Sequence, residues 1–100
     1  MRDIQHFVSG AAKAGVSDRF GEVFNPNTGE VQARVALATP AEVDAAVQAA
    51  LAAQGAWAAT NPQRRARVMF EFKRLVEASM QPLAELLSSE HGKVGADSKG

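Results

Sequence analysis

The chain has 100 residues, a length that predicts one domain rather than two. Its composition, 46% hydrophobic and 22% charged, is typical of globular proteins and excludes the disordered and fibrous classes. Eleven basic and eleven acidic side chains give a formal net charge of zero, so no excess of positive charge points to a nucleic acid or an acidic membrane as partner.

The sequence contains no cysteine, which excludes disulfides, thiolate metal sites and a cysteine nucleophile within these residues. The first residues carry an acid at Asp3 and no apolar run, so they do not resemble a secretory signal. No window approaches the length of a membrane span. These features predict a cytoplasmic protein.

Short strands joined by turns are predicted over about residues 4–38, because apolar residues alternate there and Gly, Pro and Asn interrupt them. A weak hairpin begins at Phe7 and Val8, and a stronger one pairs residues 20–24 with residues 30–37. Pro26 and Gly29 favour a type I turn with a bulge between the stronger pair. Four apolar residues of the return strand share one face, namely Val31, Ala33, Val35 and Leu37.

A first helix is predicted over residues 40–54. The Thr39 hydroxyl can accept a hydrogen bond from the amide of Glu42 while the Glu42 carboxylate reaches back, and Pro40 suits the first helical position. Gly55 stands where a left-handed residue could end the helix. Helical spacing relates five apolar residues, namely Val43, Ala46, Val47, Ala50 and Leu51.

Asn61 and Pro62 predict the start of a second helix, over residues 62–80. Pro82 should interrupt it and begin a third helix over residues 82–91, which ends at Gly92. The residues after Gly92 carry no stop signal. The apolar stripe of the second helix comprises Met69, Phe72, Val76 and Met80, with Val68 and Leu75 beside it. The predicted fold class is therefore α+β, with hairpins followed by two to three amphipathic helices.

Two binding motifs can be rejected from residue spacing. Gly92, Gly95 and Gly100 lack the spacing of a dinucleotide phosphate loop and follow a helix instead of a strand. His6 and His91 are far apart, and neither has a second histidine at helical spacing, so a zinc centre is not expected.

Three clusters invite a functional interpretation, and each has a more ordinary alternative. Residues 88–91 contain the parts of a Ser-His-acid triad, but helix neighbours point about 100° apart, which favours a polar helix end. The cluster of Arg64, Arg65 and Arg67 could bind a phosphate or carboxylate, although a solvated helix face is commoner. The aromatic residues Trp57, Phe70 and Phe72 could line a ligand pocket, but their spacing favours core packing. No catalytic, cofactor-binding or metal-binding residue is assigned.

Several segments, in order, resemble the N-terminal part of the aldehyde dehydrogenase superfamily. They are FNPNTGEV at 24–31, TPAEVDAAV at 39–47, Trp57 with the helix start at 62–67, and EHGK at 90–93. Three longer stretches look like the methylmalonate-semialdehyde, CoA-acylating branch: FGEVFNPNTG at 20–29, VQARVALA at 31–38 and WAATNPQRRARVMF at 57–70. Val94 and Gly95 depart from the family pattern.

The resemblance implies that the chain is the outer part of an NAD-binding domain within an α/β fold, truncated at residue 100. The full-length enzyme would oxidise methylmalonate or malonate semialdehyde with NAD and pass the acyl group to coenzyme A, giving propanoyl-CoA or acetyl-CoA in valine catabolism. It would be a homo-oligomer, commonly a tetramer. The catalytic cysteine and the cofactor residues would lie beyond residue 100, so neither cofactor is expected to bind this chain alone and the chain is expected to be inactive.

Two alternatives remain open: a non-catalytic interaction module, and a fragment of an NAD-dependent aldehyde dehydrogenase that releases its product to water. Because its helices lack a partner sheet, the isolated chain is also predicted to be poorly stable or self-associating.

Overall fold

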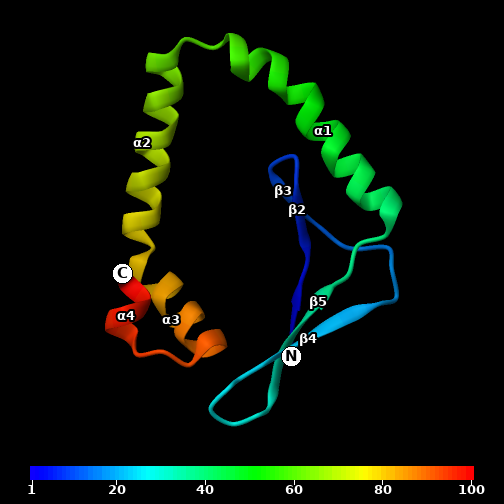
Figure 1. Cartoon of the computed structure of the whole chain (residues 1–100), viewed down its shortest axis with the longest axis vertical. Coiled ribbons are helices and arrows are strands. Elements are labelled where there is room, and N and C mark those ends of the chain that lie inside the picture. The colour runs from blue at the N-terminus through cyan, green and yellow to red at the C-terminus, as the bar shows by residue number, and fades with distance from the viewer. The chain divides into compact units, whose positions relative to one another are not determined.

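The computed structural model describes residues 1–100, with short strands followed by helices (Figure 1). This order confirms the predicted α+β character. The chain divides into two compact units. The first comprises Met1–Phe24 and Glu30–Ala58, and the second comprises Asn25–Gly29 and Ala59–Gly100.

A three-stranded sheet lies in the first unit, with β1 (Arg2–Ile4), β5 (Val31–Ala36) and β4 (Phe20–Phe24) in that spatial order. β4 and β5 form the predicted antiparallel hairpin, with a register shift beside Phe24. The turn closes through the Gly29 amide, which donates to the Asn25 carbonyl at 2.8 Å, and Gly29 has a φ of 77°. The left-handed glycine and the irregular register confirm the predicted turn with a bulge.

β1 pairs in parallel with β5, an arrangement that the sequence pattern did not predict. Ala33, in the centre of the sheet, is fully buried. On the other face, the Arg34 Nε atom lies 2.6 Å from Asp3 Oδ1, and the guanidinium carbon lies 4.2 Å from the centre of the Phe20 ring. The hydrogen bond from Arg34 holds the pKa of Asp3 below its usual value. Arg34 therefore connects all three strands.

A separate two-stranded ribbon consists of β2 (His6–Val8) and β3 (Ala11–Lys13). Ser9 and Gly10 form its two-residue turn, with φ angles of 53° and 78°. Positive φ at both turn residues matches the right-handed twist of a tight hairpin. The predicted weak hairpin is thus confirmed.

The first helix, α1 (Pro40–Ala59), begins with the predicted reciprocal cap. The Glu42 amide donates to Thr39 Oγ1 at 3.2 Å, and the Thr39 amide donates to Glu42 Oε1 at 3.0 Å. The prediction that Gly55 ends this helix was wrong, because the helix continues to Ala59. Gly55 does not take up a positive φ, and the alanines that follow it favour helix strongly enough to offset a glycine cost of about 1 kcal/mol.

α2 (Pro62–Ala78) begins at the predicted residue, where Asn61 Oδ1 accepts a hydrogen bond from the Gln63 amide at 2.8 Å. Its predicted end at residue 80 is two residues too late. Helix α3 (Met80–His91) follows after Ser79 and therefore starts two residues before Pro82. The ring of a helical proline clashes with the carbonyl four residues earlier, so continuous helix becomes unfavourable at residue 78.

α3 ends at Gly92 as predicted, with a φ of 85° and an amide that donates to the Ser88 carbonyl at 2.8 Å. A further helix, α4 (Gly95–Lys99), was not predicted. Five residues are too few to show a helical period in the sequence. The hydroxyls of Ser88 and Ser98, 2.7 Å apart, join α3 to α4, and Ala84 of α3 is buried.

Two glycine substitutions are expected to have opposite effects. Gly55→Ala should increase the helical content of the chain, since a Cβ there meets nothing within 4 Å and alanine favours helix by about 1 kcal/mol. Gly92→Ala should reduce it, because alanine is strained at positive φ and its Cβ would lie 3.1 Å from Pro26 Cγ. Circular dichroism of both variants measures the difference. A loss of helix in Gly55→Ala would contradict the assignment of Gly55 to the helix interior.

Candidate functional site

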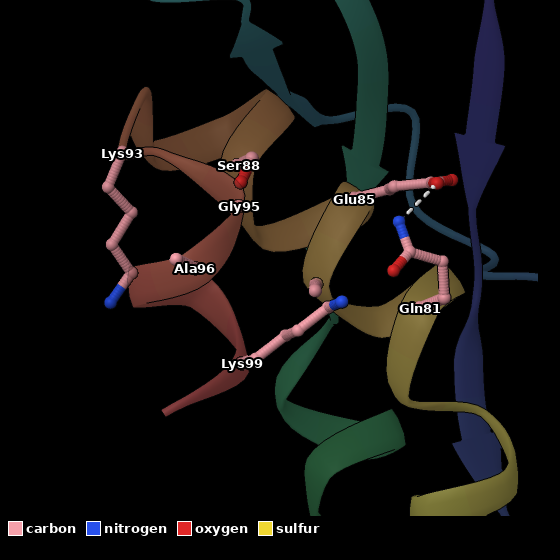
Figure 2. Close-up of a pocket in the computed structure, with 8 residues that line it drawn as sticks. Gln81, Glu85, Ser88, Lys93, Gly95, Ala96 and Lys99 are labelled. Atoms are coloured by element: carbon pink, nitrogen blue, oxygen red, sulfur yellow. Dashed lines mark hydrogen bonds between the residues drawn. The ribbon is translucent and has the colours of Figure 1, made fainter.

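A cavity of about 540 Å³ lies on the surface formed by α3 and α4 (Figure 2). The Gln81 side-chain amide donates to Glu85 Oε1 at 2.8 Å along one side of it. Figure 2 shows the amino groups of Lys93 and Lys99 pointing in different directions. The two lysines therefore do not converge on one anion, and the cavity lacks the geometry of a phosphate or carboxylate site.

The serines of the possible triad have separate partners on α3 and α4. The Ser88 hydroxyl is bound to Ser98, and the Ser89 hydroxyl donates to the Leu86 carbonyl at 2.8 Å. His91 lies in the last turn of α3, where a cation interacts favourably with the helix carbonyls. No activated nucleophile is assembled here, and the polar helix end explains these residues.

The arginines of α2 do not form a common binding surface. Arg65 Nε donates to the Thr60 carbonyl at 3.1 Å, which fastens this half-buried side chain to the residues that precede the helix. Arg67 lies instead beside Phe72 in a shallow apolar groove on α2. Arg64 and Arg67 are three residues apart and share one side of the helix, whereas Arg65 lies on another side and is bonded to Thr60, so the three side chains do not converge on one anion.

The aromatic residues are exposed, so the prediction of core packing was wrong for this chain. Trp57 is 44% exposed, Phe70 is 70% exposed and Phe72 is 59% exposed. Their helical spacing is real, but a helix buries a stripe only when a second layer covers it. The described residues supply no such layer for α2.

The most connected polar cluster lies around the Glu42 carboxylate in the first unit. Besides capping α1, Glu42 Oε2 accepts a hydrogen bond from the Val16 amide at 3.1 Å, and His6 Nε2 lies 3.5 Å from the same oxygen. The His6 Nε2 atom is buried and has no hydrogen-bond partner. The bonds from the Thr39 backbone, then from Val16 and the Thr39 hydroxyl, together with the nearby His6, lower the pKa of Glu42.

The Glu42 cluster holds the strand β2 and the segment before β4 against the start of α1. The sequence pattern predicted the cap but not the bond to Val16, because two residues 26 positions apart leave no local signal. No group of three or more His, Cys, Asp or Glu side chains is placed to hold a metal ion. The arrangement is a structural clamp, in which the Glu42 carboxylate joins three segments of the first unit beside His6.

Acid is expected to release this clamp. Because the pKa of Glu42 is lowered in the folded state, its charged form stabilises the fold above the usual carboxyl value of 4.5, and this contribution is lost as the pH falls through the folded pKa. The Val16 amide resonance should therefore shift on acidification, and the shift should vanish in Glu42→Gln. Glu85→Gln is the matched control, since Glu85 lies on α3. An unchanged titration in Glu42→Gln would contradict the assignment.

None of the helices is long and apolar enough to cross a membrane.

Comparison with known proteins gives one consistent result. Residues 13–100 match the family model described as the aldehyde dehydrogenase family. A malonate-semialdehyde dehydrogenase from Pseudomonas aeruginosa is 39% identical over 100 residues, which cover all of this chain and 20% of that protein. The human mitochondrial methylmalonate-semialdehyde/malonate-semialdehyde dehydrogenase, named as acylating, is 35% identical over 97 residues, which cover 97% of this chain and 18% of the relative.

A solved structure extends the likeness to three dimensions. It is the crystal structure of a provisionally assigned methylmalonate-semialdehyde dehydrogenase from Sinorhizobium meliloti 1021 complexed with NAD. The likeness has a TM-score of 0.97 and 55% identity, and covers all of this chain and 20% of the other. The present chain thus spans about a fifth of the length of these relatives.

Proposed function

The chain belongs to the aldehyde dehydrogenase family, and on this basis we propose that it is the N-terminal part of an NAD-dependent, CoA-acylating methylmalonate-semialdehyde dehydrogenase. The observation that carries the proposal is the likeness to the Sinorhizobium structure, 55% identical over the whole chain. Relatives named for malonate or methylmalonate semialdehyde, found independently by sequence, support the same substrate class.

The whole enzyme would oxidise methylmalonate or malonate semialdehyde to propanoyl-CoA or acetyl-CoA. NAD as oxidant is supported by the ligand of the Sinorhizobium structure, and coenzyme A as acyl acceptor by the word acylating in the name of the human relative. A homo-oligomer, commonly a tetramer, is implied by the family resemblance and is part of the proposal, as is a cytoplasmic location.

The residues of this chain do not themselves fit NAD. Gly92 caps α3 and Gly95 opens the five-residue α4, so neither forms a turn between a strand and a long helix where amides could approach a pyrophosphate. Nor does the chain contain a cysteine that could attack an aldehyde. The proposed role of these residues is therefore that of a scaffold, whose strands and helices support a catalytic centre built by other residues.

A graft tests the proposal. The matching segment of the Sinorhizobium protein is replaced by this chain, and the product is assayed for NADH formation from methylmalonate semialdehyde with and without coenzyme A. Turnover at a rate close to that of the unmodified Sinorhizobium protein supports the proposal, because these residues then serve as a scaffold for its catalytic centre. The requirement for coenzyme A is a property of the Sinorhizobium remainder, which supplies the catalytic residues, and it serves as the control for an intact centre. A folded graft that oxidises neither semialdehyde would overturn the assignment.

A further inference from the structure

The imidazole of His6 contains the one buried side-chain nitrogen or oxygen atom that has no hydrogen-bond partner, namely Nε2. His6 lies on β2, and its side chain is 21% exposed. A buried polar atom without a partner destabilises a folded protein, so such an atom requires a physical explanation. The groups around Nε2 show which partner this nitrogen can take.

Three segments of the first unit surround His6 Nε2. From α1, the Oε2 atom of Glu42 lies 3.5 Å away. From the segment between β3 and β4, a Cβ added to Gly15 would lie 3.1 Å from Nε2 and 3.0 Å from the Cβ of Ala36 in β5. The missing side chain of Gly15 thus allows the backbone to approach the imidazole closely, which leaves little room for water at Nε2.

The contact between His6 and Glu42 depends on the proton at Nε2. When neutral His6 carries its proton on Nδ1, Nε2 presents a lone pair to the carboxylate, and the two groups repel each other. When His6 is protonated, both ring nitrogens are donors, and Nε2 can donate to Glu42 Oε2. A charge-assisted bond of this kind is about 2.7–2.9 Å long, so a small movement of the imidazole completes it.

The charged groups that face His6 come from α1 and β3. On α1, the bond from the Thr39 backbone chiefly lowers the pKa of Glu42, so this carboxylate stays charged over the pH range in which histidine titrates. On β3, Lys13 is the register partner of His6, and its positive charge opposes that of an imidazolium. Lys13 is exposed, so solvent and salt screen this repulsion. Gly15 and Val16, before β4, carry no side-chain charge.

We propose that His6 is a pH-dependent latch, whose protonated imidazole bonds to the Glu42 carboxylate and holds the β2–β3 hairpin against α1 more firmly at mildly acidic pH than at alkaline pH. This inference goes beyond the proposed function, because it depends on contacts within the first unit and not on the substrate. The hairpin then responds to acid in two steps. Protonation of His6 tightens the contact, and protonation of Glu42 at lower pH releases it.

The graft of this chain into the Sinorhizobium protein allows a test in a full-length enzyme. Hydrogen exchange of the peptide that contains β2 is measured by mass spectrometry at pH 8 and pH 6, and each rate is divided by that of an unstructured peptide at the same pH. The resulting protection should rise about threefold between pH 8 and pH 6, as expected for a partly exposed ion pair.

Variants of the graft separate His6 from other titrating groups. His6→Gln should abolish the rise, because its amide can still reach Glu42 but gains no proton. Glu42→Gln should abolish it as well. Lys13→Gln should enlarge it by removing the opposing charge. His91→Gln is the matched control, since it removes the other histidine of this chain, on α3, and should leave the rise unchanged.

Three results would overturn the latch. One is a fall in protection between pH 8 and pH 6, which would show that the buried site disfavours the charged imidazole. The others are a rise that persists in His6→Gln and a rise that is lost in His91→Gln. Semialdehyde oxidation by the same graft is measured separately. An inactive graft that shows the pH response rejects the proposed function alone, whereas an active graft without the response rejects the latch alone.

Discussion

No NADH is expected to form when the bare chain is mixed with NAD, methylmalonate semialdehyde and coenzyme A. Covalent aldehyde oxidation requires an activated nucleophile, and the sequence has no cysteine to supply a thiolate. The two serine hydroxyls of the possible triad already have other hydrogen-bond partners: Ser88 is bonded to the Ser98 hydroxyl, and Ser89 donates to the Leu86 carbonyl. Loss of the nucleophile and of the cofactor site together should remove the whole rate enhancement, which is at least about a millionfold for typical enzymes.

The absorbance of NADH measures this, with the graft of this chain into the Sinorhizobium protein as the positive control. Ser88→Cys offers a sharper test, because it adds a thiol at the position with the greatest resemblance to a triad and should still give no turnover. Cofactor-linked oxidation by the purified chain would contradict both the scaffold role and the absence of a site from these residues.

Heating the isolated chain is expected to give no sharp cooperative transition. Only Ala33 and Ala84 are buried among its apolar residues, and both side chains are a single methyl group. Burying one methyl contributes about 0.8 kcal/mol, whereas ordering one residue costs about 1–2 kcal/mol in backbone entropy alone. Differential scanning calorimetry measures the transition. A sharp melt in a clearly monomeric sample would contradict the expectation.

Self-association should accompany this low cooperativity, because the chain exposes apolar helix faces. Its formal net charge is zero, so copies of the chain do not repel one another through net charge. Sedimentation velocity at increasing concentration detects it. Val47→Glu, on the exposed apolar face of α1 that Val43, Val47 and Leu51 form, should reduce association, whereas Gln48→Glu adds the same charge outside that face and should reduce it less. Equal effects would show that net charge, and not the apolar face, controls association.

Local signals explain the elements that could be predicted. The N-cap signals of two helices lie within four residues of sequence, namely Thr39 with Glu42 for α1 and Asn61 with Pro62 for α2. The first residue of each helix was therefore predicted correctly. Asn25 to Gly29 carries an equally local turn. Gly92 was recognisable as a helix end because nothing after it continues the apolar period.

Interactions between distant residues account for what the sequence did not reveal. β1 depends on a partner strand about 30 positions away, and Glu42 reaches Val16 across 26 positions. Gly55 shows a different limitation: a glycine can end a helix or be tolerated inside one, and the residues on both sides decide between them. For Phe72, the period was correct, but periodicity reports which face can be buried and not whether a partner is present.

The parallel pairing of β1 with β5 also sets the order in which the chain can fold as it is synthesised. β1 is synthesised before β5, yet it can join the sheet only when β5, which ends at Ala36, is available. β4 and β5 are joined by a short turn and can close with little loop entropy, so that hairpin provides the template and the amino terminus joins afterwards. A segment fused to Met1 would therefore stay unattached to the sheet until β5 has been synthesised and β1 has paired with it.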